Sequence, residues 1–200
     1  MLENSLTTVF GLGVLILLFG PVSGAHFNPV VSAVDRALGR RSGGGLSGPD
    51  VVAYAGAQVV GAIAGAVLAN AMFDLAPLQI ATKVRATPGL WLGEIVATAG
   101  LVALIFTLAR TGRAGLSAAD VGSYIGAAYW FTSSTSFANP AVSIGRIVSD
   151  TFAGIAPVSV PSFVVAHVVG AALGAGLVLA LYPDAARAVD DVVVPPDAVA

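Results

Sequence analysis

Two short stretches of this chain share one pattern, SGAHFNPVVS at residues 23–32 and STSFANPAVSIGR at residues 134–146. Each contains an Asn-Pro pair after a hydrophobic stretch, Asn28-Pro29 in the first and Asn139-Pro140 in the second. Asn is a strong N-cap and Pro is favoured at the first helical position, so each pair predicts the start of a helix. A helix that starts on the flank of a membrane span is typical of a broken, re-entrant helix whose N-terminus points into a cavity.

The composition independently predicts a membrane protein. Of the 200 residues, 56% are hydrophobic and only 10% are charged, and the mean hydropathy is +0.90. A soluble domain of this size needs more polar surface than that. The net charge of −2 and the scattered basic residues give no footprint for nucleic acid. The absence of cysteine excludes disulfides and thiolate metal sites, and we expect no metal or cofactor.

Five stretches are long and apolar enough to cross a bilayer, which takes about 20 residues of helix. They are Leu6–Ser23, Val51–Phe73, Leu90–Leu108, Val121–Thr135 and Ser162–Tyr182. The two segments that follow the Asn-Pro pairs, Pro29–Leu38 and Pro140–Val148, are too short to span, since ten helical residues reach only about 15 Å. Two such halves that enter from opposite faces would make one full crossing.

An internal repeat supports this layout. Residues 57–66 align with residues 166–175 at an offset of 109, and the Asn-Pro pairs are offset by 111. Two elements in the same order at nearly the same spacing indicate a duplicated unit. We therefore predict one membrane domain at residues 1–183, with a first repeat at 1–75 and a second at 88–183, followed by a disordered tail at 184–200.

With these motifs the chain resembles the aquaporin family, also called the major intrinsic proteins, whose two Asn-Pro-Ala motifs meet at the pore centre. The matching residues here are Asn28, Pro29, Val30, Asn139, Pro140 and Ala141. The resemblance implies an all-α inverted-repeat bundle with two re-entrant half-helices, a homotetramer, a multi-pass location in the plasma membrane and no enzymatic activity. The family has six spans and we expect five, because the counterpart of residues 90–108 in the first repeat would fall before Met1.

The expected chemistry follows from the helix termini. Each half-helix presents unpaired N–H groups and a partial positive charge at its N-terminus. Where two such ends meet, a cation or proton encounters a barrier, whereas a neutral hydroxylated solute finds donors on Asn28 and Asn139. The alternative interpretation is that each Asn-Pro pair caps an ordinary helix.

The resemblance also implies four filter positions, which spacing from the two Asn residues places at Thr8, Ala127, Ser136 and Val142. Water-selective relatives have an aromatic residue, a His and an Arg in this ring, and the Arg position is Val142 here. We expect a wide ring without a fixed cation, lined by the hydroxyls of Thr8 and Ser136. Such a ring favours glycerol-like polyols or undissociated metalloid acids such as arsenous acid.

Other polar residues receive structural interpretations. Glu94 is the only acidic residue within an expected span, and by resemblance we expect it to brace a pore loop, with a proton relay as the alternative. His26 is expected to orient its own loop. The pairs Gly61 with Gly65 and Gly170 with Gly174 predict close helix crossings within one protomer.

Two further hypotheses remain for the function. An intramembrane hydrolase would use Ser23 or Ser136 with His26 or His167, but Glu94 is the only acid available in a span and no strained serine motif is present. The other hypothesis is a non-conducting fragment that lacks one span and only assembles with other protomers.

Overall fold

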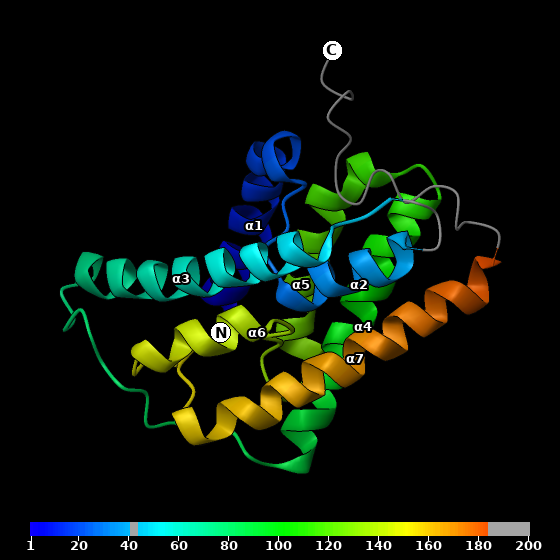
Figure 1. Ribbon diagram of the computed structural model, residues 1–200. Helices are drawn as coiled ribbons and strands as arrows, with labels where there is room; N and C mark the ends of the chain where they lie inside the picture. Colours follow the sequence, from blue (N-terminus) through cyan, green and yellow to red (C-terminus); the bar gives the residue numbers. More distant parts are fainter. Residues whose placement is uncertain (41–43, 184–200) are drawn as a thin grey trace.

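The computed structural model describes residues 1–40 and 44–183, and these residues form helices and loops without a strand (Figure 1). The helices are α1 (Leu2–Ser23), α2 (Pro29–Gly39), α3 (Gly48–Met72), α4 (Pro88–Arg110), α5 (Ser117–Phe131), α6 (Pro140–Gly145) and α7 (Val160–Leu181). Short 3₁₀ helices are η1 (Ala114–Leu116), η2 (Arg146–Val148) and η3 (Pro157–Ser159). The prediction of an all-α membrane protein is thus confirmed. The predicted tail at 184–200 lies outside the described residues.

Four of the long helices, α1, α3, α4 and α7, are long and apolar enough to cross a membrane. The fifth expected span lies four residues earlier than predicted, because α5 runs from Ser117 to Phe131. It has the same 15 residues as the predicted stretch, and it is shorter than the four helices that are long enough to cross a membrane. The next residues run in non-helical conformations to Asn139, with positive φ angles at Thr135, Ser136 and Ala138. They form the loop that carries the chain from the end of α5 to the start of α6.

Both Asn-Pro pairs begin helices, as their sequence predicts. The Oδ1 atom of Asn28 accepts a hydrogen bond from the Val30 N–H at 3.2 Å, and that of Asn139 accepts one from the Ala141 N–H at 2.9 Å. These are N-cap bonds, and each Pro occupies the first helical turn, where its missing donor is harmless. We call α2 the first half-helix, and α6 together with η2 the second half-helix.

Glycines allow two pairs of helices to pack closely, α4 with α7 and α1 with α5. A Cβ atom added at Gly170 on α7 would lie 2.5 Å from the Ile95 carbonyl oxygen of α4, and one added at Gly122 on α5 would lie 2.6 Å from the Val9 carbonyl oxygen of α1. Small residues let helix backbones approach in this way inside a bilayer. The predicted close crossing at Gly170 is therefore confirmed.

The matching prediction for α3 is wrong within the described residues. Gly61 and Gly65 have no neighbouring atom within 4 Å of an added Cβ. No residue of the most apolar window of α3 is buried, whereas 56% of the corresponding window of α4 is. Figure 1 shows α3, in cyan, along the edge of the bundle. The described residues supply no helix that packs on α3 as α4 packs on α7.

A pair of matched substitutions tests this asymmetry. We expect Gly170→Ala to lower the free energy of unfolding by about 1–3 kcal/mol, since the added methyl forces α4 and α7 apart. Gly61→Ala meets open space and is expected to leave stability unchanged or to raise it by up to about 1 kcal/mol through helix propensity. Thermal unfolding of the two purified variants in detergent measures both effects. Equal losses would show that the Gly61 face of α3 is covered.

Candidate functional site at the two half-helices

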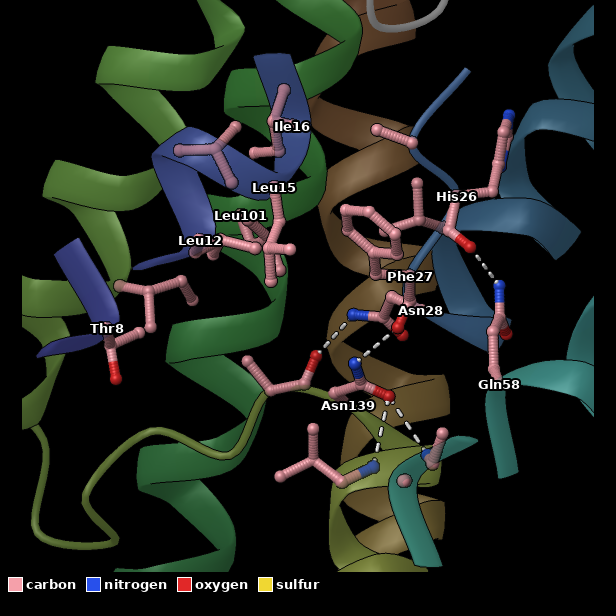
Figure 2. A pocket seen from close by; sticks show the side chains of 18 of the residues that line it. Thr8, Leu12, Leu15, Ile16, His26, Phe27, Asn28, Gln58, Leu101 and Asn139 are labelled. Atoms are coloured by element: carbon pink, nitrogen blue, oxygen red, sulfur yellow. Dashed lines mark hydrogen bonds between the residues drawn. The ribbon is translucent and has the colours of Figure 1, made fainter. Parts of the chain in front are cut away.

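The starts of the two half-helices are joined by reciprocal hydrogen bonds. The Nδ2 group of Asn28 donates to the Ala138 carbonyl at 2.7 Å, and the Nδ2 group of Asn139 donates to the Phe27 carbonyl at 2.8 Å. Figure 2 shows the two amides side by side between the half-helices, with these bonds dashed. Each Asn thus caps its own helix through Oδ1 and holds the loop of the other repeat through Nδ2. The structure therefore brings together two motifs that are 111 residues apart in sequence.

Glu94 holds the loop before α6 in place. Its carboxylate accepts hydrogen bonds from the backbone N–H of Phe137 at 2.9 Å and of Ala138 at 2.7 Å, and His167 Nε2 lies 2.7 Å from the same carboxylate. Both Glu94 and His167 are fully buried. The bonds offset the strain of the positive φ angles in this loop, which amounts to about 1–3 kcal/mol for each such residue. These contacts are the ones that a bracing role requires.

His26 lies in the corresponding loop of the first repeat. Its Nδ1 atom is 3.2 Å from the Ser32 hydroxyl, and its carbonyl accepts a hydrogen bond from Gln58 Nε2 at 2.6 Å (Figure 2). The ring also makes an edge contact with Tyr54. The His26 side chain is thus tied to α2 and α3, which agrees with the orienting role that we expect for it.

A cavity of about 780 Å³ opens at the Asn pair. Its walls come from α1, α3, α4, α5 and both half-helices, and Figure 2 shows Thr8, Leu12, Leu15, Ile16, Leu101 and Phe27 among the side chains that line it. Most of the wall is apolar, and its polar side chains include those of Asn28 and Asn139. This arrangement suits a solute that has both a carbon surface and hydroxyl groups.

Three of the four predicted filter residues, Thr8, Ser136 and Val142, line this cavity. Ala127 does not line it, and its side chain is exposed, so this assignment needs correction. Tyr129 of α5 occupies the cavity wall instead. A shift of two residues turns a side chain by about 200° around a helix, and counting back from Asn139 through the non-helical loop could not fix that rotation.

The wall of the cavity also contains a cation that the predicted filter positions did not include. Arg146, the first residue of η2, lines the cavity, and its Nη2 atom donates to the Tyr129 hydroxyl at 3.0 Å. Thr8 Oγ1 lies 3.4 Å from the same hydroxyl. Arg146 follows Val142 by four positions, which is one helical turn. This spacing was the sequence signal that could have placed Arg146 on the same side of the second half-helix.

The bracing contacts of Glu94 lead to a stability test. Glu94→Ala leaves two loop N–H groups and His167 without their acceptor, and we expect it to lower the free energy of unfolding by about 3–5 kcal/mol. The matched control is Glu3→Ala at the chain's other glutamate, which is exposed and should change stability little. Thermal unfolding in detergent compares the two. A stable Glu94→Ala variant would mean that the carboxylate does not hold the loop.

The comparisons with known proteins agree with this geometry. The family model described as major intrinsic protein matches residues 1–136. The chain is 50% identical over 171 residues to aquaglyceroporin AqpS of Rhizobium meliloti (strain 1021), an alignment that covers 86% of this chain and 71% of the relative.

A second relative is more distant. The chain is 33% identical over 133 residues to aquaporin-5 of Rattus norvegicus, and this alignment covers 61% of this chain and 47% of that protein. Members of the matched family are channels, so the prediction that the chain is not an enzyme is confirmed and the hydrolase hypothesis falls. The chain belongs to the major intrinsic protein family.

Proposed function

We propose that this chain conducts small neutral solutes passively through the cavity between its half-helices, and that the solutes include glycerol-like polyols and undissociated metalloid acids such as arsenous acid, besides water. Its family and its relatives support a membrane channel for small neutral solutes. The relative in Rhizobium meliloti is named an aquaglyceroporin, which favours solutes larger than water.

The paired Asn amides are the observation that carries this proposal. Each Nδ2 group has two N–H donors, and within the described residues only one of them donates to a protein carbonyl. The second donor of Asn28 and of Asn139 can therefore bind the oxygen of a passing solute. The same point lies between two helix N-termini, whose partial positive charges oppose a cation. A neutral hydroxylated molecule is the solute that fits both conditions.

The size and lining of the cavity can accommodate solutes bulkier than water. A cavity of about 780 Å³ has room for a solute much larger than one water molecule. Leu12, Ile16 and Leu101 form an apolar wall opposite the Asn pair (Figure 2). A polyol can place its carbon atoms against this wall and its hydroxyls on the amides.

We further propose that the protein works as a homotetramer in the plasma membrane. The large apolar side chains on the exposed faces of the long helices, such as Leu17, Val60 and Leu173, would contact lipid or other protomers. The competing proposal of a non-conducting protomer rests on α3, which lines the cavity but has no buried residue in its most apolar window, so that this side of the cavity wall is a single helix. A flux measurement decides between the two.

The flux of water, glycerol and arsenous acid into liposomes that contain the purified chain tests the channel function. We expect all three to enter faster than into empty liposomes, with glycerol and arsenous acid well above the lipid background. Because the chain has no cysteine, a mercurial should leave the flux unchanged, which identifies flux through this protein rather than through a thiol-bearing contaminant. Flux that appears only after an apolar helix is added before Leu2 would support the non-conducting alternative.

A second prediction concerns Asn139. Asn139→Asp keeps an acceptor for the Ala141 N–H but loses the donor to Phe27 and places a negative charge between the helix N-termini. We expect glycerol flux to fall and a cation leak to appear, as measured with dye-loaded liposomes. Asn4→Asp, at an exposed position on α1, is the matched control and should change neither flux. An Asn139→Asp channel with unchanged selectivity would contradict the role of the Asn pair.

A further inference from the structure

We propose that Arg146 is the selectivity-determining cation of this channel, and that its guanidinium, fixed by Tyr129, excludes cations and binds the oxygens of neutral solutes with several hydroxyl groups. The inference rests on the proposed channel function and names the group that selects its solutes. The residue lies one turn beyond Val142, the filter position at which the resemblance led us to expect no cation.

The guanidinium of Arg146 is held at two points. Its Nη2 atom donates to the Tyr129 hydroxyl at 3.0 Å, and its Cζ atom lies 4.1 Å from the centroid of the Phe137 ring. A charge stacked on an aromatic face and bonded to a phenol has little freedom to move away. Arg146, Tyr129 and Phe137 all line the cavity, so the fixed charge stands in the wall that a solute must pass.

This charge is not neutralised by an acid. Within residues 1–40 and 44–183 the one carboxylate that forms an ion pair is Glu94, and its partner is His167. Arg146 has no carboxylate partner in the described part of the chain. An unneutralised charge in a partly buried wall repels other cations strongly, because screening by water is reduced there.

Arg146 also has donors to spare. Its Nη1 atom is buried and makes no hydrogen bond, and the Ser136 hydroxyl, which belongs to the same cavity, is likewise buried without a partner. Buried polar groups without partners are uncommon in proteins, and each needs an explanation. Both atoms are enclosed in this structure, so a solute with two or more oxygens reaches them only when these side chains turn toward it, and the planar guanidinium then presents its donors as a fork.

Arg85 provides an internal comparison. It packs 4.9 Å from the same Phe137 ring, but it donates to three backbone carbonyls, those of Gly154, Ser134 and Phe152. It is buried and lies outside the cavity lining. Burial, with a further contribution from the nearby Arg146, lowers the pKa of Arg85 to about 10. Arg85 thus stays charged at neutral pH, but its donors bond to loop carbonyls, whereas most donors of Arg146 have no protein acceptor within the described residues.

The experiment uses liposomes with the full chain and compares wild type with Arg146→Ala, Arg146→Lys and Tyr129→Phe. We expect Arg146→Ala to raise sodium permeability by about tenfold or more, since the repulsion from a unit charge at close range exceeds thermal energy several-fold. Arg146→Lys keeps the charge but not the fork, so sodium should stay excluded while the ratio of glycerol to water flux changes. Tyr129→Phe removes one of the two contacts that hold the guanidinium and should change the ratio of glycerol to water flux in the same direction as Arg146→Lys. Arg113→Ala, on an exposed loop, is the control and should match wild type.

Chemical rescue separates the charge from the fold. The chain has no cysteine, so Arg146→Cys introduces its only thiol. After the protein has folded, a methanethiosulfonate reagent with an amino group should restore sodium exclusion, and one with a sulfonate group should not. This comparison holds the fold constant and varies only the sign of the charge.

Two results would overturn the inference alone. One is an Arg146→Ala protein that conducts glycerol as fast as wild type and has the same sodium permeability and the same ratio of glycerol to water flux. The other is equal behaviour of the Arg146→Cys protein after either reagent. Absence of any solute flux in the wild-type protein would instead refute the proposed channel function, and the inference with it. Thermal unfolding of each variant identifies any that fails to fold, in which case the reagent comparison decides.

Discussion

The structure depends on satisfying polar backbone groups at the point where two half-helices meet inside a bilayer. A loop at that depth has no bulk water to bond, so each carbonyl and N–H needs a protein partner. The amides of Asn28 and Asn139 meet this requirement for the carbonyls of Ala138 and Phe27. Because each amide belongs to one repeat and its acceptor to the other, neither half-helix start is complete alone. The cavity exists because this exchange holds two short helices end to end.

The two repeats satisfy their loops unequally. In the second repeat, the Glu94 carboxylate accepts from two loop N–H groups and contacts His167. In the first repeat, Gln58 occupies the position aligned with His167 and donates to the His26 carbonyl, while its own Oε1 is buried without a partner. Within the described residues the backbone N–H groups of His26 and Phe27 donate to no protein acceptor. The first repeat thus lacks a counterpart of the Glu94 carboxylate for its loop N–H groups. It is also the repeat in which α3 lacks a packed neighbour.

Sequence predicted the features whose register is set locally. Asn-Pro fixes a helix start to the residue, because the N-cap and the proline act within one turn, and both half-helices begin where expected. The repeat also indicated that the two motifs would meet. Ala127 was placed wrongly because its position was counted through a loop with three positive φ angles, whose path no periodicity describes. The exposure of Gly61 could not be predicted either, because a small-residue pair shows that a helix can be approached closely but not that a partner is present.

Arg146 illustrates why a residue type at one motif position is a weak guide to the electrostatics of a pore. Val142 is apolar, and comparison by position alone therefore removes the cation from the ring. A half-helix, however, presents residues four apart on the same side, and the long arginine side chain can extend back along it to the Tyr129 hydroxyl. A guanidinium can be held at a given place in space from more than one backbone position, because an aromatic ring and a hydroxyl, here Phe137 and Tyr129, fix its tip. The charge of a constriction is thus a property of its side-chain tips, which sequence specifies only together with the rotation of the helices that carry them.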